Sequence, residues 1–119
     1  MRGILLEAIE VARRVVAAAS EKKATDIVLL DARGVCSFTD YLVLCNAESS
    51  KQSEAIFREI GQLLKKQGIL PHHCEGTVDS GWLLIDLNDV IVHIFAPEER
   101  ERYQLDRLWE RAIPILRIQ

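Results

Sequence analysis

The sequence predicts an α/β fold, a single domain whose mixed sheet of about five strands is flanked by helices. Helical patterns at residues 4–20 and 49–68 alternate with short apolar runs along the chain, and residues 81–95 have the pattern of a complete β-hairpin. A chain of 119 residues has the usual size of one domain. We therefore expect residues 1–119 to form one domain.

The hairpin is the best-defined predicted element. Its two strands flank Asn88-Asp89, residue types that tolerate positive φ in a two-residue turn. Because side chains alternate along a strand, one face should hold only aliphatic residues. The other face, called the mixed face below, combines aromatic, apolar and ionisable side chains, and it pairs Trp82 with Phe95, Leu84 with His93 and Asp86 with Ile91. The aliphatic face is predicted core, whereas the mixed face needs another layer, a catalytic cleft or a partner to cover it.

The first half of the chain predicts a helix and two strands. Apolar residues within 4–20 recur at the spacing of a helix that packs on a sheet. Residues 25–31 contain a continuous apolar run at 27–30, which predicts a strand buried on both faces. A short connection leads to a strand at 41–45, so these two strands should be antiparallel neighbours.

The second half adds a helix, a weak strand and a C-terminal helical segment. Ser49 and Gln52 form a capping box at the start of the helix. Residues 69–75 contain a proline, so a strand there suits only an edge of the sheet, or begins in the second half of that range. Pro97 begins the last helical segment and Pro114 ends it.

Charge is distributed unevenly along the chain. Between Lys66 and Arg100 there is no Lys or Arg, although six acidic residues fall there: Glu75, Asp79, Asp86, Asp89, Glu98 and Glu99. This segment includes the hairpin, whose surroundings should repel a phosphate backbone. A basic protein or a metal ion would be attracted, and a solvated acidic surface is the simpler interpretation. We expect no direct nucleic-acid contact.

Sequence features also indicate a cytoplasmic location. No apolar run is long enough to span a bilayer, and the N-terminus lacks the layout of a secretion signal. Cys36, Cys45 and Cys74 are widely spaced, which predicts reduced, buried thiols. A cytoplasmic protein without membrane attachment is therefore expected.

Catalytic motifs give little support for an enzyme. The glycines form no phosphate-binding loop, and no G-x-S-x-G motif is present. His72, His73 and Cys74 have no second ligand pair at zinc spacing, so no metal or cofactor is expected. His93 could be a pH-sensitive contact or a general base, or could simply form a hydrogen bond within its sheet.

The carboxylates leave one enzymatic alternative. A metal-dependent nucleotidyltransferase needs acidic side chains that converge on divalent ions. Four aspartates could converge through folding: Asp26, Asp31, Asp40 and Asp86. The missing phosphate loop argues against this alternative.

Several short motifs, in order and at characteristic spacing, carry a family resemblance. They are Thr39-Asp40-Tyr41, Ser49-x-Lys51-Gln52, Glu75-Gly76, Trp82-x-Leu84-x-Asp86, Asp89-Val90-x-Val92-His93-x-Phe95 and Arg100-x-x-Tyr103-x-Leu105-x-x-Leu108-Trp109. Together they resemble the ribosomal silencing factor family, also called RsfS or Iojap. Two positions depart from the family pattern, since Ala47 and Asn88 stand where the family usually has glycine.

This resemblance implies a fold like that of nucleotidyltransferases, without their phosphate-handling motif. It also implies a non-enzymatic translational repressor that acts when nutrients are short. Such a repressor docks on the large-subunit ribosomal protein L-fourteen and sterically stops the small subunit from joining. Family members are commonly seen as dimers, so a homodimer is a further expectation.

We expect the mixed face to be the contact surface for this partner. Trp82 is the predicted anchor, since aromatic anchors dominate interface energetics. Leu84, Ile91 and Phe95 would surround it, and Asp86 would face a basic partner. The remaining predicted contact residues are His93, Tyr103, Asp40 and Tyr41. The alternative is that the first or last helix simply covers Trp82 and Phe95.

Overall fold

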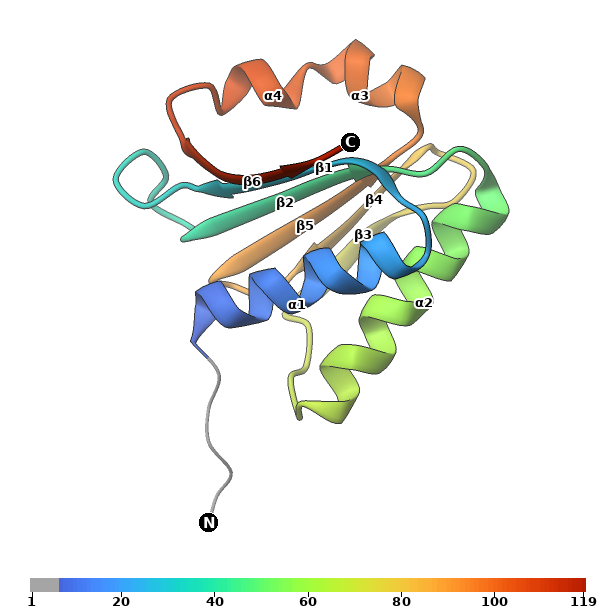
Figure 1. Cartoon of the computed structure of the whole chain (residues 1–119), viewed down its shortest axis with the longest axis horizontal. Coiled ribbons are helices and arrows are strands. Elements are labelled where there is room, and N and C mark those ends of the chain that lie inside the picture. Colours follow the sequence, from blue (N-terminus) through green and yellow to red (C-terminus); the bar gives the residue numbers. More distant parts are fainter. Residues whose placement is uncertain (1–6) are drawn as a thin grey trace.

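The computed structural model describes residues 7–119 and contains the predicted mixture of helices and strands (Figure 1). Residues 4–6 of the predicted first helix lie outside the described residues. The elements, in chain order, are α1 (Ala8–Glu21), β1 (Thr25–Asp31), β2 (Tyr41–Asn46), α2 (Ser50–Lys66), β3 (His73–Thr77), β4 (Trp82–Asp86), β5 (Val90–Phe95), α3 (Pro97–Tyr103), α4 (Leu105–Leu108) and β6 (Ile113–Ile118).

The strands form one mixed sheet of six strands in the order β3-β4-β5-β2-β1-β6. Only β2 and β5 are parallel, and the predicted antiparallel pairing of β1 with β2 is confirmed. The predicted strand at 69–75 is present as the edge strand β3, which begins only at His73. β6 was missed because Pro114 was interpreted as the end of the helical segment. Pro114 lies instead in β6 at the opposite edge, where a missing N–H is tolerated.

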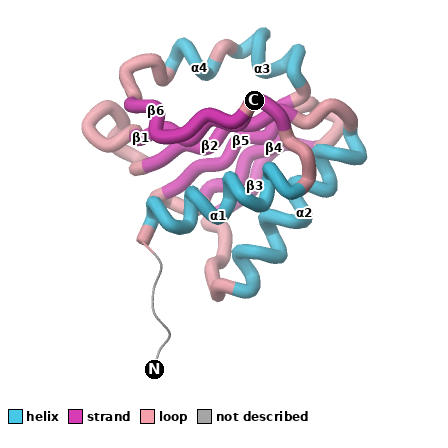
Figure 2. The backbone as a smooth tube through the Cα atoms, in the orientation of Figure 1, coloured by secondary structure: helices cyan, strands magenta, loops and turns pink. Residues whose placement is uncertain are grey.

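Helices cover both faces of the sheet (Figures 1 and 2). α1 and α2 lie on one face, and α3 and α4 cross the other. The prediction that β1 is buried on both faces is confirmed, because Ile27 and Leu29 belong to the α1–α2 core and Val28 and Leu30 to the second core. No helix within residues 7–119 is long and apolar enough to cross a membrane.

The hairpin has the predicted register, with Trp82 opposite Phe95 and Asp86 opposite Ile91. Its aliphatic face packs into the core beneath α1 and α2, as expected. Asn88 has φ +74°, whereas Asp89 has an ordinary negative φ, so only one of the two turn residues is left-handed. The Asp86 carboxylate stabilises the turn by accepting the Asn88 N–H at 2.8 Å.

The capping prediction for α2 is confirmed with one difference. The Ser49 hydroxyl accepts the Gln52 N–H at 3.1 Å, but the Gln52 side-chain oxygen accepts the N–H of Glu48, not that of Ser49. The Gln52 amide also donates to the carbonyl oxygens of Lys22 and Lys23, at 3.1 and 2.8 Å. The start of α2 is thereby joined to the turn that follows α1.

The cysteines only partly match the expectation of buried thiols. All three are free, as predicted. Cys45 is fully buried, but Cys36 is half-buried and Cys74 is exposed. Cys74 is exposed because it lies in β3, an edge strand whose residues are all exposed.

Arg100, on α3, ties the C-terminal segment to the sheet. Its side chain is only 7% exposed, and its guanidinium donates two hydrogen bonds to Asp106, at 3.0 and 2.9 Å. The third nitrogen of the same guanidinium, Nη1, donates to the carbonyl oxygen of Asp26 at 2.6 Å and to the side-chain oxygen of Asn46 at 3.0 Å. One buried cation therefore joins α3 to β1, β2 and the start of α4.

Replacing Arg100 with methionine should lower the free energy of unfolding by about 3 kcal/mol, because it removes the charge-assisted hydrogen bonds to Asp106 and the hydrogen bond to the Asp26 carbonyl. Urea denaturation of the purified variant measures this loss. Arg111→Met is the matched control, since Arg111 is exposed, and it should change stability by no more than about 0.5 kcal/mol. Equal losses in the two variants would contradict the structural role of Arg100.

Candidate functional site

The mixed face is only partly open to solvent. On β5, Ile91, His93 and Phe95 are buried, with Phe95 fully so, because the C-terminal segment covers this strand. On β4, Trp82 and Leu84 are half-buried. The expectation that Ile91, His93 and Phe95 form contact surface is therefore corrected, since these three side chains support the surface from beneath.

Trp82 lies at the centre of an aromatic cluster. Its ring centroid is 5.1 Å from that of Phe95 and 4.8 Å from that of Tyr103 on α3. Tyr103 remains 49% exposed, so the predicted contact residue does reach the surface. The alternative that a helix covers Trp82 is met only in part, because α3 covers one portion of the indole through Tyr103 and leaves another portion accessible. The role of Trp82 as an anchor stays a prediction.

His93 holds the orientation of Trp82. The indole N–H donates to Nδ1 of His93 at 3.1 Å, and the two ring centroids are 5.9 Å apart. This hydrogen bond requires that Nδ1 carry no proton. Burial lowers the pKa of His93 to about 4, so the imidazole is neutral at ordinary pH. His93 acts here as a hydrogen-bond acceptor within the sheet.

Asp40 and Tyr41 lie away from this cluster. Tyr41 pairs with Val90 at the start of β5, whereas Trp82 pairs with Phe95 at its end, a separation of about 16 Å along the strand. Tyr41 is also buried in the core on the α1–α2 face. Its predicted place in the contact surface is corrected for that reason, and half-buried Asp40 lies at the same distant end.

A pocket of about 250 Å³ opens beside Trp82. It is lined by Glu75 and Gly76 of β3, Trp82 and Leu84 of β4, and Ser80 of the connecting turn. Gly76 has φ +87°, and a Cβ atom there would collide with the carbonyl oxygen of Trp82. Glycine is therefore required where β3 and β4 approach each other. The Glu75-Gly76 and Trp82-x-Leu84-x-Asp86 motifs supply four of the five residues that line the pocket.

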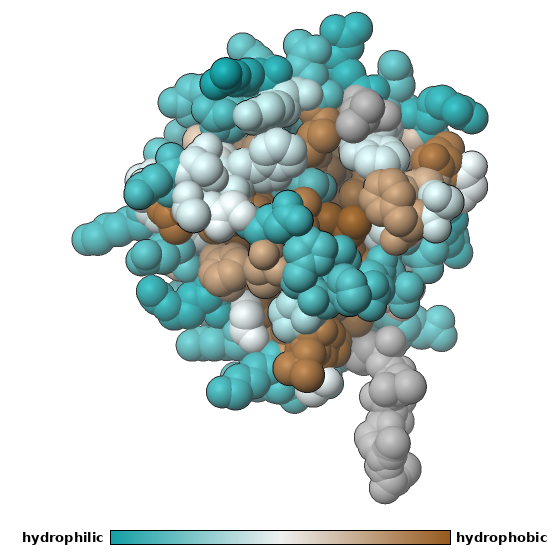
Figure 3. Space-filling model, turned by 180° about the vertical axis from the view of Figure 1, so that it is seen from behind, coloured by the Kyte–Doolittle hydropathy of each residue, from teal (hydrophilic) through white to brown (hydrophobic). Residues whose placement is uncertain are grey.

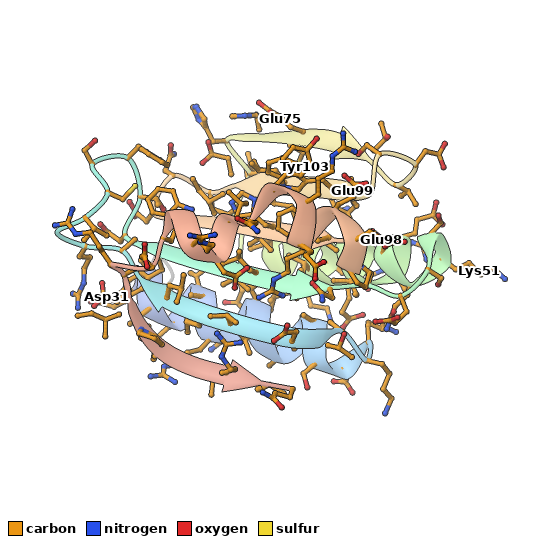
Figure 4. All side chains as sticks on the ribbon, turned by 90° about the horizontal axis from the view of Figure 1, so that it is seen from above. Asp31, Lys51, Glu75, Glu98, Glu99 and Tyr103 are labelled. Atoms are coloured by element: carbon orange, nitrogen blue, oxygen red, sulfur yellow. The ribbon has the colours of Figure 1, made fainter. Side chains whose placement is uncertain are left out.

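Two carboxylates lie near the pocket and the aromatic cluster. The Glu75 side chain is 66% exposed, and one of its oxygens contacts His73 Nε2 at 2.9 Å. Glu99 packs against Gly81, next to Trp82. In Figure 4, Glu75, Tyr103 and Glu99 follow one another along the same side of the molecule, while Asp31 lies at another end. Seen from behind in Figure 3, the surface mixes apolar side chains with hydrophilic ones.

Asp86 is less available than the sequence suggested. Its Oδ1 accepts the Asn88 N–H, and its Oδ2 lies 3.5 Å from Nδ1 of His73. The side chain is only 19% exposed. Glu75, which was not among the predicted contact residues, is the more accessible carboxylate at this site.

The four aspartates of the enzymatic alternative do not form a cluster. Asp31 is held by Arg33, whose hydrogen bonds at 3.0 and 2.8 Å lower the pKa of the carboxyl group. Asp26 pairs with Arg117 at 3.2 Å instead. In the part of the chain that the structure describes, no group of three or more His, Cys, Asp or Glu side chains is placed to share a metal ion.

Comparison with known proteins identifies relatives across nearly the whole chain. The family model described as ribosomal silencing factor during starvation matches residues 6–119. The ribosomal silencing factor of Bacillus subtilis is 42% identical over 93 residues, which cover 78% of this chain and 79% of that protein. A crystal structure from Chromobacterium violaceum aligns with TM-score 0.84 and 28% identity, covering 88% of each chain. A second crystal structure, from Bacillus halodurans, has TM-score 0.79 and 35% identity, and covers 91% of this chain and 98% of that one.

The buried His93 predicts a loss of stability in weak acid. The unfolded chain binds a proton near the ordinary pKa of 6.5, whereas the folded chain does so only near 4. The contribution of His93 to the free energy of unfolding should therefore be highest above pH 6.5, fall by about 2–3 kcal/mol as pH drops to 4, and level off below that. Urea denaturation at a series of pH values measures this dependence.

His93→Gln is the control, because glutamine can accept the Trp82 N–H but does not titrate. Its stability should change little between pH 6.5 and 4. The lowered pKa values of Asp31 and Asp106 affect stability only below their ordinary value of 3.8, outside this window. An unchanged slope in His93→Gln would show that another group is responsible.

Proposed function

Because the chain belongs to the ribosomal silencing factor family, we propose that it represses translation by binding the large ribosomal subunit and preventing the small subunit from joining. The proposed partner is the large-subunit protein L-fourteen, and the proposed contact surface surrounds Trp82. The place of action is the cytoplasm, where translating ribosomes are found. The observation that carries this proposal is the accessible portion of Trp82, supported from within by Phe95 and Tyr103.

A supported tryptophan is well suited to anchor a protein interface. Interface hot spots are enriched in Trp, Tyr and Arg, and the strongest are preorganised before the partner arrives. Here the hydrogen bond to His93 and the contact with Tyr103 hold the indole in one orientation. The adjacent pocket adds a cavity that a partner side chain can fill. Little conformational entropy would then be lost on binding.

Charge supports a basic protein partner in preference to ribosomal RNA. The segment from 67 to 99, which contributes the pocket, has six acidic residues and no Lys or Arg. A surface of this sign repels a phosphate backbone and attracts a basic protein. The ribosome exposes both RNA and basic proteins, so this acidic face would bind a ribosomal protein in preference to ribosomal RNA.

We also propose that the protein acts without catalysis. The aspartates considered for metal binding point to different neighbours, and Asp31 and Asp26 are each paired with an arginine. The sequence contains no phosphate-binding loop that would hold a nucleotide. A steric mechanism needs neither feature, because repression follows from occupying the surface where the small subunit would join.

The proposal is tested by mixing purified ribosomal subunits with the protein and separating them on sucrose gradients. We expect joined ribosomes to decrease as protein is added, and the protein to migrate with the large subunit. Unchanged subunit joining at saturating protein, or migration with the small subunit, would contradict the proposed function.

Trp82→Ala should weaken binding to the large subunit by about 30-fold, since an anchoring aromatic residue typically contributes 2 kcal/mol or more. Co-sedimentation over a range of protein concentrations measures the loss. The melting transition must be recorded too, because Trp82 also contacts Phe95 and Tyr103 within the protein. Binding is then compared at a temperature where the variant is folded.

Phe38→Ala is the matched control. Phe38 is an aromatic residue that is 62% exposed and lies against Trp109, not against the Trp82 cluster. This variant should bind the large subunit as the unmodified protein does. If folded Trp82→Ala keeps full affinity, the contact surface lies elsewhere on the molecule.

A further inference from the structure

We propose that the pocket beside Trp82 receives one arginine side chain of the protein partner, with its guanidinium stacked on the indole and bound to Glu75. This inference rests on the proposed function, because it specifies the chemistry of the partner at the same surface. It goes further by assigning one occupant to the pocket and one carboxylate to its recognition.

The walls of the pocket suit the two parts of an arginine side chain. Trp82 and Leu84 provide apolar surface for the methylene groups, which bury readily while the charged end stays polar. Trp82 also presents the best aromatic face for a cation, and guanidinium stacks on such faces because it is planar and weakly hydrated. The volume of about 250 Å³ provides room for one such side chain.

Glu75 is the charged group that lines the pocket. Its Oε2 contacts His73, whereas Oε1 has no hydrogen bond to any described residue. The Ser80 hydroxyl is already engaged with Thr77 and Trp82, at 2.7 and 3.0 Å from their carbonyl oxygens. Glu75 is thus the acceptor best placed to meet an incoming cation, and a carboxylate can bind guanidinium through two parallel hydrogen bonds.

The surroundings favour a cation that comes from outside. The stretch between Lys66 and Arg100 has no Lys or Arg of its own that could occupy the pocket. The same surface already shows one guanidinium–aromatic contact, because Arg102 lies 5.8 Å from the ring centroid of Tyr103. Arg102 lies over Tyr103, and the indole of Trp82 remains the wall of the pocket.

A direct test uses the indole N–H of Trp82 as a reporter in nuclear magnetic resonance spectra of the full chain. Trp109→Phe distinguishes the two indole signals. N-acetyl-arginine methylamide should shift the Trp82 signal progressively, and the citrulline analogue, which has the same shape without the charge, should not. In Glu75→Gln the shift should be lost. Equal shifts with citrulline, or a shift unaffected by Glu75→Gln, would overturn the assignment.

The second test measures binding to the large subunit. Glu75→Gln keeps an oxygen for the contact with His73 but removes the charge, and it should weaken binding about tenfold. Glu98→Gln is the control, since Glu98 is acidic and exposed but does not line this pocket, and it should have a much smaller effect. Equal weakening by the two variants, or none by Glu75→Gln, would contradict the arginine proposal.

These experiments separate the two hypotheses. If the unmodified protein does not bind the large subunit, the proposed function fails, and the response to the arginine amide still reports on the pocket. If the protein binds the large subunit but the citrulline analogue shifts the Trp82 signal as much as the arginine amide does, only the pocket assignment fails. A mass that rises with concentration and returns to that of a monomer in Glu75→Gln would show that a second copy of the chain fills the pocket, which would also overturn the proposal.

Discussion

The buried guanidinium of Arg100 determines where the C-terminal segment lies on the sheet. It contacts the backbone of β1, the side chain at the end of β2, and Asp106 on α4. A buried cation that lost these acceptors would be strongly destabilising, so α3 has little freedom to move away. Tyr103 is three residues further along α3, and its position over Trp82 follows from this attachment. The geometry of the candidate site therefore depends on a contact outside it.

The short length of α3 explains why Trp82 is only partly covered. The helix spans Pro97–Tyr103, and Gln104 then adopts φ +52°, which ends it. Tyr103 is consequently the last helical side chain that reaches the indole, and the chain turns into α4 over another part of the sheet. The end of α3 at Tyr103 thus limits how much of the indole this helix covers.

The sequence was informative where local chemistry determines structure. The hairpin register, the positive φ of Asn88 and the cap at Ser49 depend on residues close together in the chain, and all three were predicted. The family resemblance also identified the fold class correctly. The sixth strand was missed because a proline such as Pro114 is common both just after a helix and within an edge strand. Only the pairing of this segment with β1 distinguishes the two.

The contact residues were harder to predict, because exposure depends on which distant element covers a strand. The alternation that placed Phe95 and His93 beside Trp82 was correct, but it contained no information on the cover provided by α3. Tyr41 was assigned to the surface although the face it occupies packs against α1 and α2. Arg100 was noticed only as the end of the acidic segment and as part of the family motif. Its structural role required knowing that β1, β2 and α4 meet around it.

Both edges of the sheet favour recognition by side chains over the addition of a partner strand. β6 contains Pro114, a register shift opposite β1, and the charged Arg117. β3 has only five residues and exposes His73 and Glu75. Prolines, irregular pairing, charged side chains and short length all weaken an edge as a template for another strand. The specific contacts available near β3 are then the indole of Trp82 and the carboxylate of Glu75, so a partner would be selected by the side chains it presents to that pocket.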